Sequence, residues 1–152
     1  MKKRKLIIIV LAFLAFTFYT VFEQYINRET EIVENIISED KTFTSKDEVA
    51  LYIKVYKKLP NNYITKKQAA NLGYVASKAN LWDVTNKMSI GGDRFFNREN
   101  LLPDKKSREY YEADIDFVGG YRNDKRIVYS NDGLIYYTAD HYDSFTLLYG
   151  DE

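Results

Sequence analysis

The sequence predicts an α+β fold, in which N-terminal helices pack on a C-terminal antiparallel sheet of five strands. Apolar residues recur at helical spacing early in the chain, and strand-like runs begin at Ser89. An Asp132-Gly133 dipeptide between two apolar runs is typical of a hairpin turn. The chain has 152 residues, of which 45% are hydrophobic and none is cysteine, so one domain without disulfides is expected.

The first 42 residues differ from the rest in composition. Residues 1–22 combine a basic start with an uncharged run over residues 6–22, and predict a signal peptide or signal anchor. As a helix the run spans roughly 26 Å, slightly less than a bilayer core of about 30 Å. Because no small-residue cleavage site follows, a retained membrane anchor is favoured over a cleaved signal. Residues 23–42 are acidic and predict a stalk or propeptide, and residues 43–152 predict the exported domain.

Three helices are expected at the start of this domain. Ser45-Lys46-Asp47-Glu48 has the pattern of a capping box. An apolar stripe at i, i+3, i+4 and i+7 follows it: Val49, Tyr52, Ile53 and Tyr56. Thr65 caps a second short helix that Gly73 closes. A third short helix over residues 80–85 carries Trp82, the only tryptophan, as a packing residue.

Strands are expected from Ser89 onwards. After the first, they cover residues 107–115, 124–130, 134–138 and 144–148. Alternation within residues 110–117 places three acids on one face, opposite apolar side chains. These acids are Glu112, Asp114 and Asp116. They predict a polar sheet surface that faces a cleft.

Four side chains between residues 110 and 142 have the chemistry to cleave RNA without a metal: Glu112, Arg122, Arg126 and His141. A carboxylate can take the proton of a ribose 2′-hydroxyl, an imidazole can protonate the leaving 5′-oxygen, and guanidinium groups can hold the phosphate. A single histidine is more often structural, and arginines often form surface ion pairs. These residue types alone therefore leave the assignment open.

The order of these residues resembles the barnase-like family, the secreted guanyl-preferring bacterial ribonucleases. Within the candidate site, the matching segments are Glu112-Ala113-Asp114-Ile115, Arg122-Asn123, Arg126-Ile127 and Asp140-His141-Tyr142. Outside it they are Leu59-Pro60-Asn61-Asn62-Tyr63-Ile64-Thr65-Lys66, Val75-Ala76-Ser77-Lys78 and Ser89-Ile90-Gly91-Gly92-Asp93. The resemblance covers residues 43–149, about two thirds of the chain, and implies the microbial ribonuclease fold.

The resemblance also implies a role for each matching residue. Glu112 is the implied general base and His141 the implied general acid. The implied phosphate contacts are Lys66, Arg122 and Arg126. Asp114 is implied to support the arginines from a buried position. Without the resemblance, Lys66 would be read as an exposed lysine, since a helix N-terminus disfavours a cation.

A guanine-reading loop is implied at Phe95-Phe96-Asn97-Arg98-Glu99. Guanine presents N1–H and N2–H side by side, and the carboxylate of Glu99 can accept both. Backbone N–H groups of Asn97 and Arg98 would meet O6, and the ring of Tyr142 would stack on the base. Phe96 departs from the family, which has a small polar residue there.

The net charge of the domain and the spacing of its possible metal ligands restrict how it can bind RNA and whether it can use a metal. Residues 43–152 hold 16 basic and 16 acidic side chains, so bulk attraction to RNA is weak. Binding then relies on a local cluster: Lys66, Arg98, Arg122 and Arg126. No Cys, His or carboxylate set has metal-ligand spacing, so neither a metal nor another cofactor is expected.

The sequence therefore predicts an exported, monomeric endoribonuclease. It is expected to cleave single-stranded RNA 3′ of guanine through a 2′,3′-cyclic phosphate. The resemblance implies an intracellular barstar-like inhibitor as a protein partner. The alternative is a catalytically inactive, membrane-tethered module that binds RNA or protein.

Overall fold

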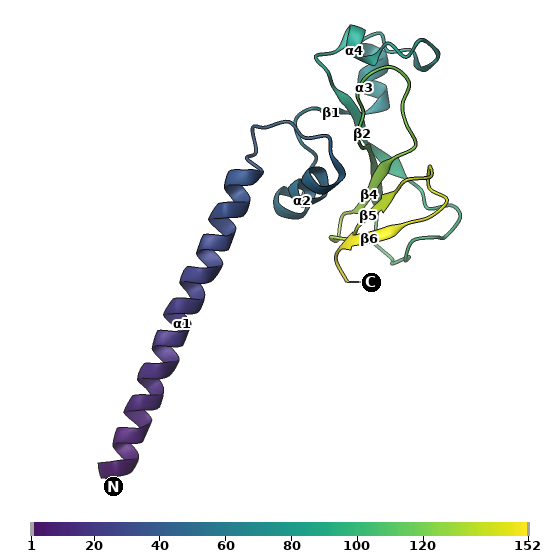
Figure 1. Ribbon diagram of the computed structural model, residues 1–152. Coiled ribbons are helices and arrows are strands. Elements are labelled where there is room, and N and C mark those ends of the chain that lie inside the picture. Colours follow the sequence, from purple (N-terminus) through teal and green to yellow (C-terminus); the bar gives the residue numbers. More distant parts are fainter. Residues whose placement is uncertain (1, 152) are drawn as a thin grey trace. The chain divides into compact units, whose positions relative to one another are not determined.

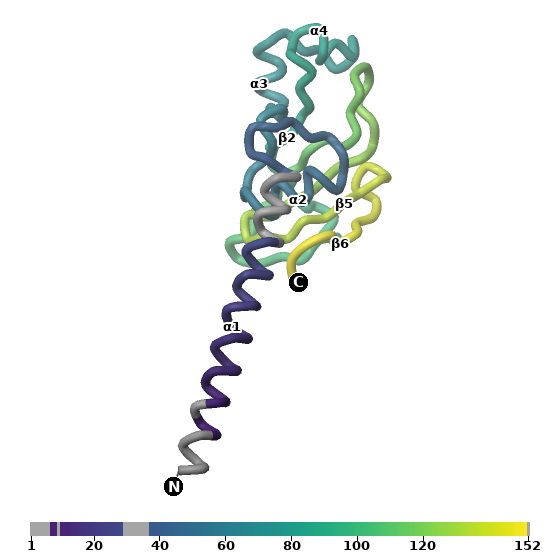
Figure 2. The backbone as a smooth tube through the Cα atoms, turned by 60° about the vertical axis from the view of Figure 1, so that its left-hand side comes forward, coloured from purple at the N-terminus to yellow at the C-terminus, as the bar shows by residue number. Residues whose placement is uncertain are grey.

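The computed structural model describes residues 2–151, apart from the side chains of residues 2–6, 9 and 29–36. The chain divides into two compact units, residues 1–38 and 39–152. The first is occupied by the long helix α1, Lys2–Ile36 (Figures 1 and 2). Within the described residues, no helix is both long and apolar enough to cross a membrane.

The second unit begins at Glu39, a few residues before the predicted start of the domain at residue 43. The Glu39 carboxylate pairs with Lys58, and its carbonyl accepts a hydrogen bond from the Tyr52 hydroxyl at 3.1 Å. The Asn62 side chain bonds both backbone groups of Phe43, at 3.2 and 2.9 Å. These contacts fix residues 39–43 to the rest of the unit.

Helix α2, Lys46–Tyr56, follows the predicted apolar stripe. Val49, Tyr52 and Ile53 are buried as expected. The predicted capping box was wrong, because the Ser45 hydroxyl donates to the Glu48 carboxylate and accepts no backbone N–H. Helix α2 packs against three strands of the sheet: β4 (Arg126–Ser130), β5 (Ile135–Thr138) and β6 (Thr146–Tyr149).

Helix α3, Lys66–Asn71, begins with a full capping box. Gln68 N–H donates to Thr65 Oγ1 at 3.2 Å, and Thr65 N–H donates to Gln68 Oε1 at 2.8 Å. The short 3₁₀ helix η1, Ala76–Lys78, was not predicted, and the third predicted helix is α4, Leu81–Val84. Helix α3 packs on strand β2 (Ser89–Phe95), which places its first turn beside the sheet (Figure 1).

The sheet has six strands whose spatial order follows the chain order. They are β1 Tyr63–Ile64, β2 Ser89–Phe95, β3 Tyr110–Asp114, β4 Arg126–Ser130, β5 Ile135–Thr138 and β6 Thr146–Tyr149. The five predicted antiparallel strands correspond to β2 through β6, so the α+β prediction is confirmed. The extra strand β1 is parallel to β2 and only two residues long.

Two apolar clusters lie within the part of this unit that the structure describes. One lies among β3, β4 and β5 and contains Leu102, Tyr110, Val128, Leu134 and Tyr136. The other contains Ala69, Leu81, Ile90 and Phe117, with Trp82 packed edge-on against Phe117 at 5.5 Å between ring centroids. A Cβ at Gly119 would lie 2.7 Å from the Trp82 ring, so this turn needs glycine for close approach as well as for its φ of +90°.

The three acids of the predicted polar face do not share a solvent-facing surface. Glu112 and Asp114 are 6% and 1% exposed. Strand β3 ends at Asp114, and Asp116 has a φ of +56° and pairs with Lys125 instead. Glu112 and Asp114 share a face of β3, but that face is buried. The prediction was wrong for Asp116 because alternation applies only while the strand continues.

Candidate active site

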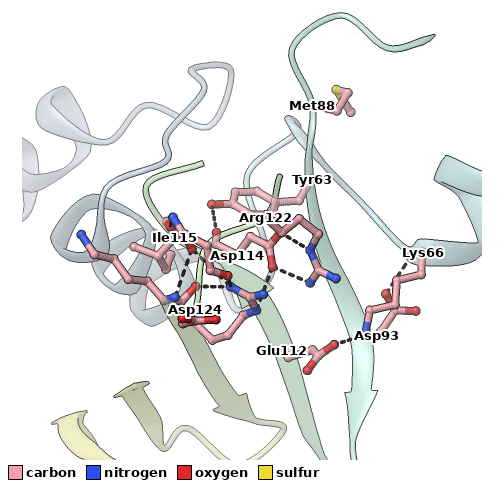
Figure 3. A network of polar contacts seen from close by, with 12 residues as sticks. Tyr63, Lys66, Met88, Asp93, Glu112, Asp114, Ile115, Arg122 and Asp124 are labelled. Atoms are coloured by element: carbon pink, nitrogen blue, oxygen red, sulfur yellow. Dashed lines mark hydrogen bonds and ion pairs between the residues drawn. The ribbon is translucent and has the colours of Figure 1, made fainter. Parts of the chain in front are cut away.

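Glu112 lies in the middle of β3 and contacts two other candidate residues. One carboxylate oxygen pairs with Lys66 Nζ (Figure 3). The other accepts a hydrogen bond from the Tyr142 hydroxyl. Lys66 is positioned by the capping box of α3 and by its backbone N–H, which donates to Asp93 Oδ2 at 2.8 Å. The structure thus brings side chains from α3 and from the loop after β5 to one carboxylate of β3.

The surroundings of Glu112 keep its carboxyl group ionised. Burial alone would raise its pKa, but the hydrogen bonds from Lys66 and Tyr142 and the charge of Arg122 together lower the pKa below its ordinary value. A buried anion that is held ionised can accept a proton. In turn, burial and the bond to Glu112 raise the pKa of Tyr142, whose hydroxyl stays protonated.

Asp114 joins the two arginines. Arg122 donates from Nε and Nη2 to its two carboxylate oxygens, each at 2.6 Å. Arg126 Nε lies 2.9 Å from Oδ1 as an ion pair, without the direction of a hydrogen bond. The Arg126 head group is fixed by Nη1, which donates to the carbonyls of Asn123 at 2.7 Å and Lys125 at 2.6 Å. Although burial opposes it, the bond to Asp114 raises the pKa of Arg122.

Two further residues hold this arrangement, and neither was assigned a role from the sequence. The Tyr63 hydroxyl donates to the Asp114 carbonyl at 2.8 Å (Figure 3). The Asn123 amide donates to the carbonyls of Ile115 at 2.9 Å and Asp116 at 3.1 Å, so it closes the loop that carries Arg122. Asn123 was part of a matching segment, which was the one signal for it. The position of Tyr63 depends on the pairing of β1 with β2, which was not predicted.

His141 and Tyr142 lie on the loop between β5 and β6, both with positive φ, of 58° and 80°. The Asp140 carboxylate holds this loop by accepting from Ser144 N–H at 2.9 Å, Ser144 Oγ at 2.5 Å and Thr138 Oγ1 at 2.8 Å. These bonds, led by the Ser144 hydroxyl, lower the pKa of Asp140 to about 2. They fix the turn on which His141 and Tyr142 lie.

The His141 ring points to solvent and is close to one carboxylate. Its side chain is 60% exposed, and Nδ1 lies 3.6 Å from Asp124 Oδ1. The His141 N–H donates to the Asp124 carbonyl at 3.1 Å, which fixes the backbone beside the cleft. An exposed imidazole in this place can reach a bound ligand.

A cleft of about 480 Å³ gathers the predicted phosphate contacts and the histidine. It is lined by Lys66, Tyr74, Ala76, Tyr121, Arg122, Asn123, Asp124, Arg126 and His141. The walls formed by Tyr74 and Tyr121 were not predicted. A larger groove, of about 720 Å³, lies elsewhere on the unit along Tyr63, Tyr111 and Tyr129, and none of the predicted site residues is among the described residues that line it.

The predicted guanine-reading loop begins next to Tyr142. The Phe95 ring lies 5.1 Å from the Tyr142 ring between centroids. The Asn97 side chain bonds both backbone groups of Leu102, at 2.8 and 3.0 Å, which closes the loop. Arg98 and Glu99 are exposed on it and do not line the cleft. The loop and the cleft are thus separate, and Tyr142 lies between them through its contacts with Phe95 and Glu112.

The sequence of this chain is similar to those of known ribonucleases. A sequence model of the ribonuclease family matches residues 46–149. The ribonuclease of Bacillus intermedius is 58% identical over 100 residues, 66% of this chain and 62% of that protein. The ribonuclease of Heyndrickxia coagulans is 58% identical over 99 residues, 65% of this chain and 91% of that protein.

A shorter similarity involves the guanyl-specific ribonuclease St of Saccharopolyspora erythraea, which is 40% identical over 57 residues, 37% of this chain and 56% of that protein. The chain spans less than two thirds of the length of the Bacillus relatives. The family match covers well over half of the chain and includes every predicted catalytic residue. The chain belongs to the ribonuclease family.

Proposed function

We propose that this protein is an exported, guanyl-preferring endoribonuclease. It cleaves single-stranded RNA 3′ of guanine by transesterification to a 2′,3′-cyclic phosphate, which it then hydrolyses, without a metal. The observation that carries the proposal is the buried, ionised carboxylate of Glu112, held by Lys66 and Tyr142 beside a cationic cleft. The guanine preference is supported by the similarity to a guanyl-specific ribonuclease.

In the first step, the ribose 2′-oxygen attacks the phosphorus and gives its proton to Glu112. The bond to the 5′-oxygen breaks, and that oxygen takes a proton from His141. In the second step, water attacks the phosphorus of the cyclic phosphate and gives a proton to His141. The bond from phosphorus to the 2′-oxygen breaks, and that oxygen takes a proton from Glu112. Both groups then return to their starting protonation states. The exposure of the His141 ring supports its contact with the leaving group.

The phosphate is proposed to bind in the cleft between Lys66, Arg122 and Arg126. As the 2′-oxygen attacks, negative charge increases on the non-bridging oxygens, and fixed cations stabilise it. Asp114 holds the guanidinium groups in place before the substrate arrives, so little reorganisation accompanies the reaction. Lys66 pairs with Glu112 and also lines the cleft. Its ammonium group can therefore pair with the carboxylate before the reaction, and with the phosphate once Glu112 has taken up the proton.

Base selection is assigned to the loop that follows Phe95. The Glu99 carboxylate accepts N1–H and N2–H of guanine, the N–H groups of Asn97 and Arg98 meet O6, and Tyr142 stacks on the base. Adenine presents an acceptor at N1, which a carboxylate disfavours. The ordered turn made by Asn97 supports this assignment, because a preformed loop loses little entropy on binding.

Export is proposed because a basic segment precedes the uncharged run of residues 6–22. A nuclease of this kind endangers the cell that makes it until it has left. An intracellular inhibitor that presents acids to the cationic cleft is therefore proposed as its protein partner.

The test uses the full chain and a single-stranded RNA with one guanine, incubated with EDTA. Cleavage should occur after the guanine, and the product should carry first a 2′,3′-cyclic phosphate and later a 3′-phosphate, as mass spectrometry can show. Glu112→Gln is the control for a contaminating nuclease. Activity that EDTA abolishes and a divalent ion restores would refute the mechanism. RNA binding without any product would instead identify an inactive binding module.

A further inference from the structure

An aromatic ring lies exposed beside the guanine-reading loop. Phe96 directly follows β2, and 67% of its surface is accessible to solvent. Its neighbour Phe95 packs between Tyr142 and Phe145, with centroids at 5.1 and 6.0 Å. Phe95 is half-buried. Because successive side chains of an extended segment point to opposite sides, the inward packing of Phe95 turns Phe96 outward.

The backbone around Phe96 is held in one conformation. Asn97 and Asn100 have positive φ, of 45° and 53°, and Asn100 N–H donates to the Asn97 carbonyl at 3.0 Å. The Asn97 side chain closes the turn on Leu102. The exposed ring is therefore carried by an ordered loop, and an aromatic ring on an ordered loop can act as a binding surface.

Two guanidinium groups flank the ring. Arg94 and Arg98 lie 5.8 and 5.7 Å from the Phe96 centroid. Arg94 also pairs with Glu109, whereas Arg98 makes no ion pair within the described residues. An exposed aromatic ring beside a free cation is the combination that binds single-stranded nucleic acid, with a base on the ring and a phosphate on the cation.

We propose that Phe96 is a stacking site for the base on the 5′ side of the guanine, with Arg98 at the intervening phosphate. The inference rests on the proposed function, because Glu99 and its loop must hold the guanine. The 3′-phosphate of that guanosine lies in the cleft with Arg122 and His141, so the 3′ nucleotide continues away from the loop. The 5′ neighbour is the one that can fold back over Phe96.

The experiment compares two trinucleotides with the full chain: ApGpU, and the same molecule with an abasic ribose in place of adenosine. Both keep the phosphate that faces Arg98, so their ratio of kcat/KM isolates the base. Wild type should prefer ApGpU by about fivefold or more, the low end of the range for stacking one base on an aromatic side chain. Phe96→Leu should bring the ratio close to one, and Phe96→Trp should preserve it.

Leu101→Ala is the matched control, because Leu101 is 53% exposed on the same loop and has no aromatic ring. This variant should keep the wild-type ratio. Dissociation constants of the 2′-deoxy forms, which cannot be cleaved for want of a 2′-hydroxyl, give the same ratio independently of catalysis.

Three outcomes decide the matter. Ratios that fall in Phe96→Leu alone support the stacking site. Equal ratios in wild type and Phe96→Leu overturn it, and leave the exposed ring as a surface for a protein partner. A binding ratio that depends on Phe96 without cleavage of either trinucleotide supports the stacking site and refutes the proposed catalytic activity.

Discussion

Asp114 binds Arg122 through both carboxylate oxygens, with Nε and Nη2 of the arginine each at 2.6 Å. The same carboxylate lies 2.9 Å from Arg126 Nε. The side chains of Asp114 and Arg126 are 1% and 3% exposed. One buried carboxylate thus orients both guanidinium groups of the cleft and neutralises part of their mutual repulsion.

Asp114→Asn should destabilise the protein strongly. It removes the charge while the Arg126 guanidinium remains buried, and breaking a buried pair in this way typically costs about 3–5 kcal/mol. Asp116→Asn is the matched control, since its pair with Lys125 is 40–45% exposed and should contribute less than about 1 kcal/mol. Urea unfolding measures both free energies. Similar decreases in unfolding free energy for the two variants would show that Asp114 stabilises the fold no more than the exposed Asp116 does.

His141→Ala and Glu112→Ala should differ in their dependence on the leaving group. His141→Ala should lower RNA cleavage by roughly 10²–10⁴-fold, as expected for lost acid catalysis. It should spare much of the reaction of a guanosine 3′-aryl phosphodiester, whose leaving group departs readily as an anion. Glu112→Ala should damage both reactions, because the 2′-hydroxyl must lose its proton in each.

Single-turnover rates on the two substrates give the comparison, with circular dichroism to confirm that each variant is folded. Equal losses on both substrates for His141→Ala would exclude the histidine as the general acid. A loss for Glu112→Ala on RNA alone would remove the carboxylate from the role of general base.

Glu99→Ala should weaken base selection more than catalysis. It removes the acceptor for N1–H and N2–H of guanine, so kcat/KM should fall far more for GpU than for ApU. Substitution of the neighbouring acid Asp104, as Asp104→Ala, is the control for charge alone. An unchanged ratio of GpU to ApU would move guanine reading to another part of the loop.

Asp140→Asn should alter how stability depends on pH. The pKa of Asp140 is about 2 in the folded protein, below the ordinary value of about 3.9. Its ionised form therefore stabilises the fold fully above about pH 4, and this contribution is lost as the pH falls through about 2. The difference in unfolding free energy between wild type and Asp140→Asn should thus be constant near neutral pH and shrink below about pH 4. Asp143→Asn in the same loop is the control, and a difference that does not change with pH would contradict the assignment.

The parts of the fold that were predicted are those with a strong local pattern. The stripe of α2 and the turn at Asp132-Gly133 each have one. Strand β1 and helix η1 have two and three residues, too few to show a period. The Ser45 hydroxyl can donate to Glu48 or accept from the backbone, and the sequence of a capping box is the same for both.

The candidate site shows the same division. Glu112, His141 and the arginines were proposed because their side chains have the reactive groups that the chemistry needs and because their order resembles the barnase-like family. Tyr63 was missed because its hydroxyl reaches the Asp114 carbonyl across 51 positions of sequence, through a strand pairing that no local pattern predicts. The loop that carries His141 is held by three hydrogen bonds to Asp140, which residue types alone do not reveal.

The contact between Lys66 and Glu112 joins residues 46 positions apart. The other four proposed catalytic and supporting side chains lie on β3, on β4, on the loop that joins them and on the loop after β5. In this part of the sheet each strand pairs with its neighbour in sequence. During refolding, this part can assemble by successive hairpins, whereas Lys66 arrives only when α3 docks on β2. Nuclease activity would then return only when α3 has docked. During refolding, it should therefore return later than the β-sheet signal in far-ultraviolet circular dichroism.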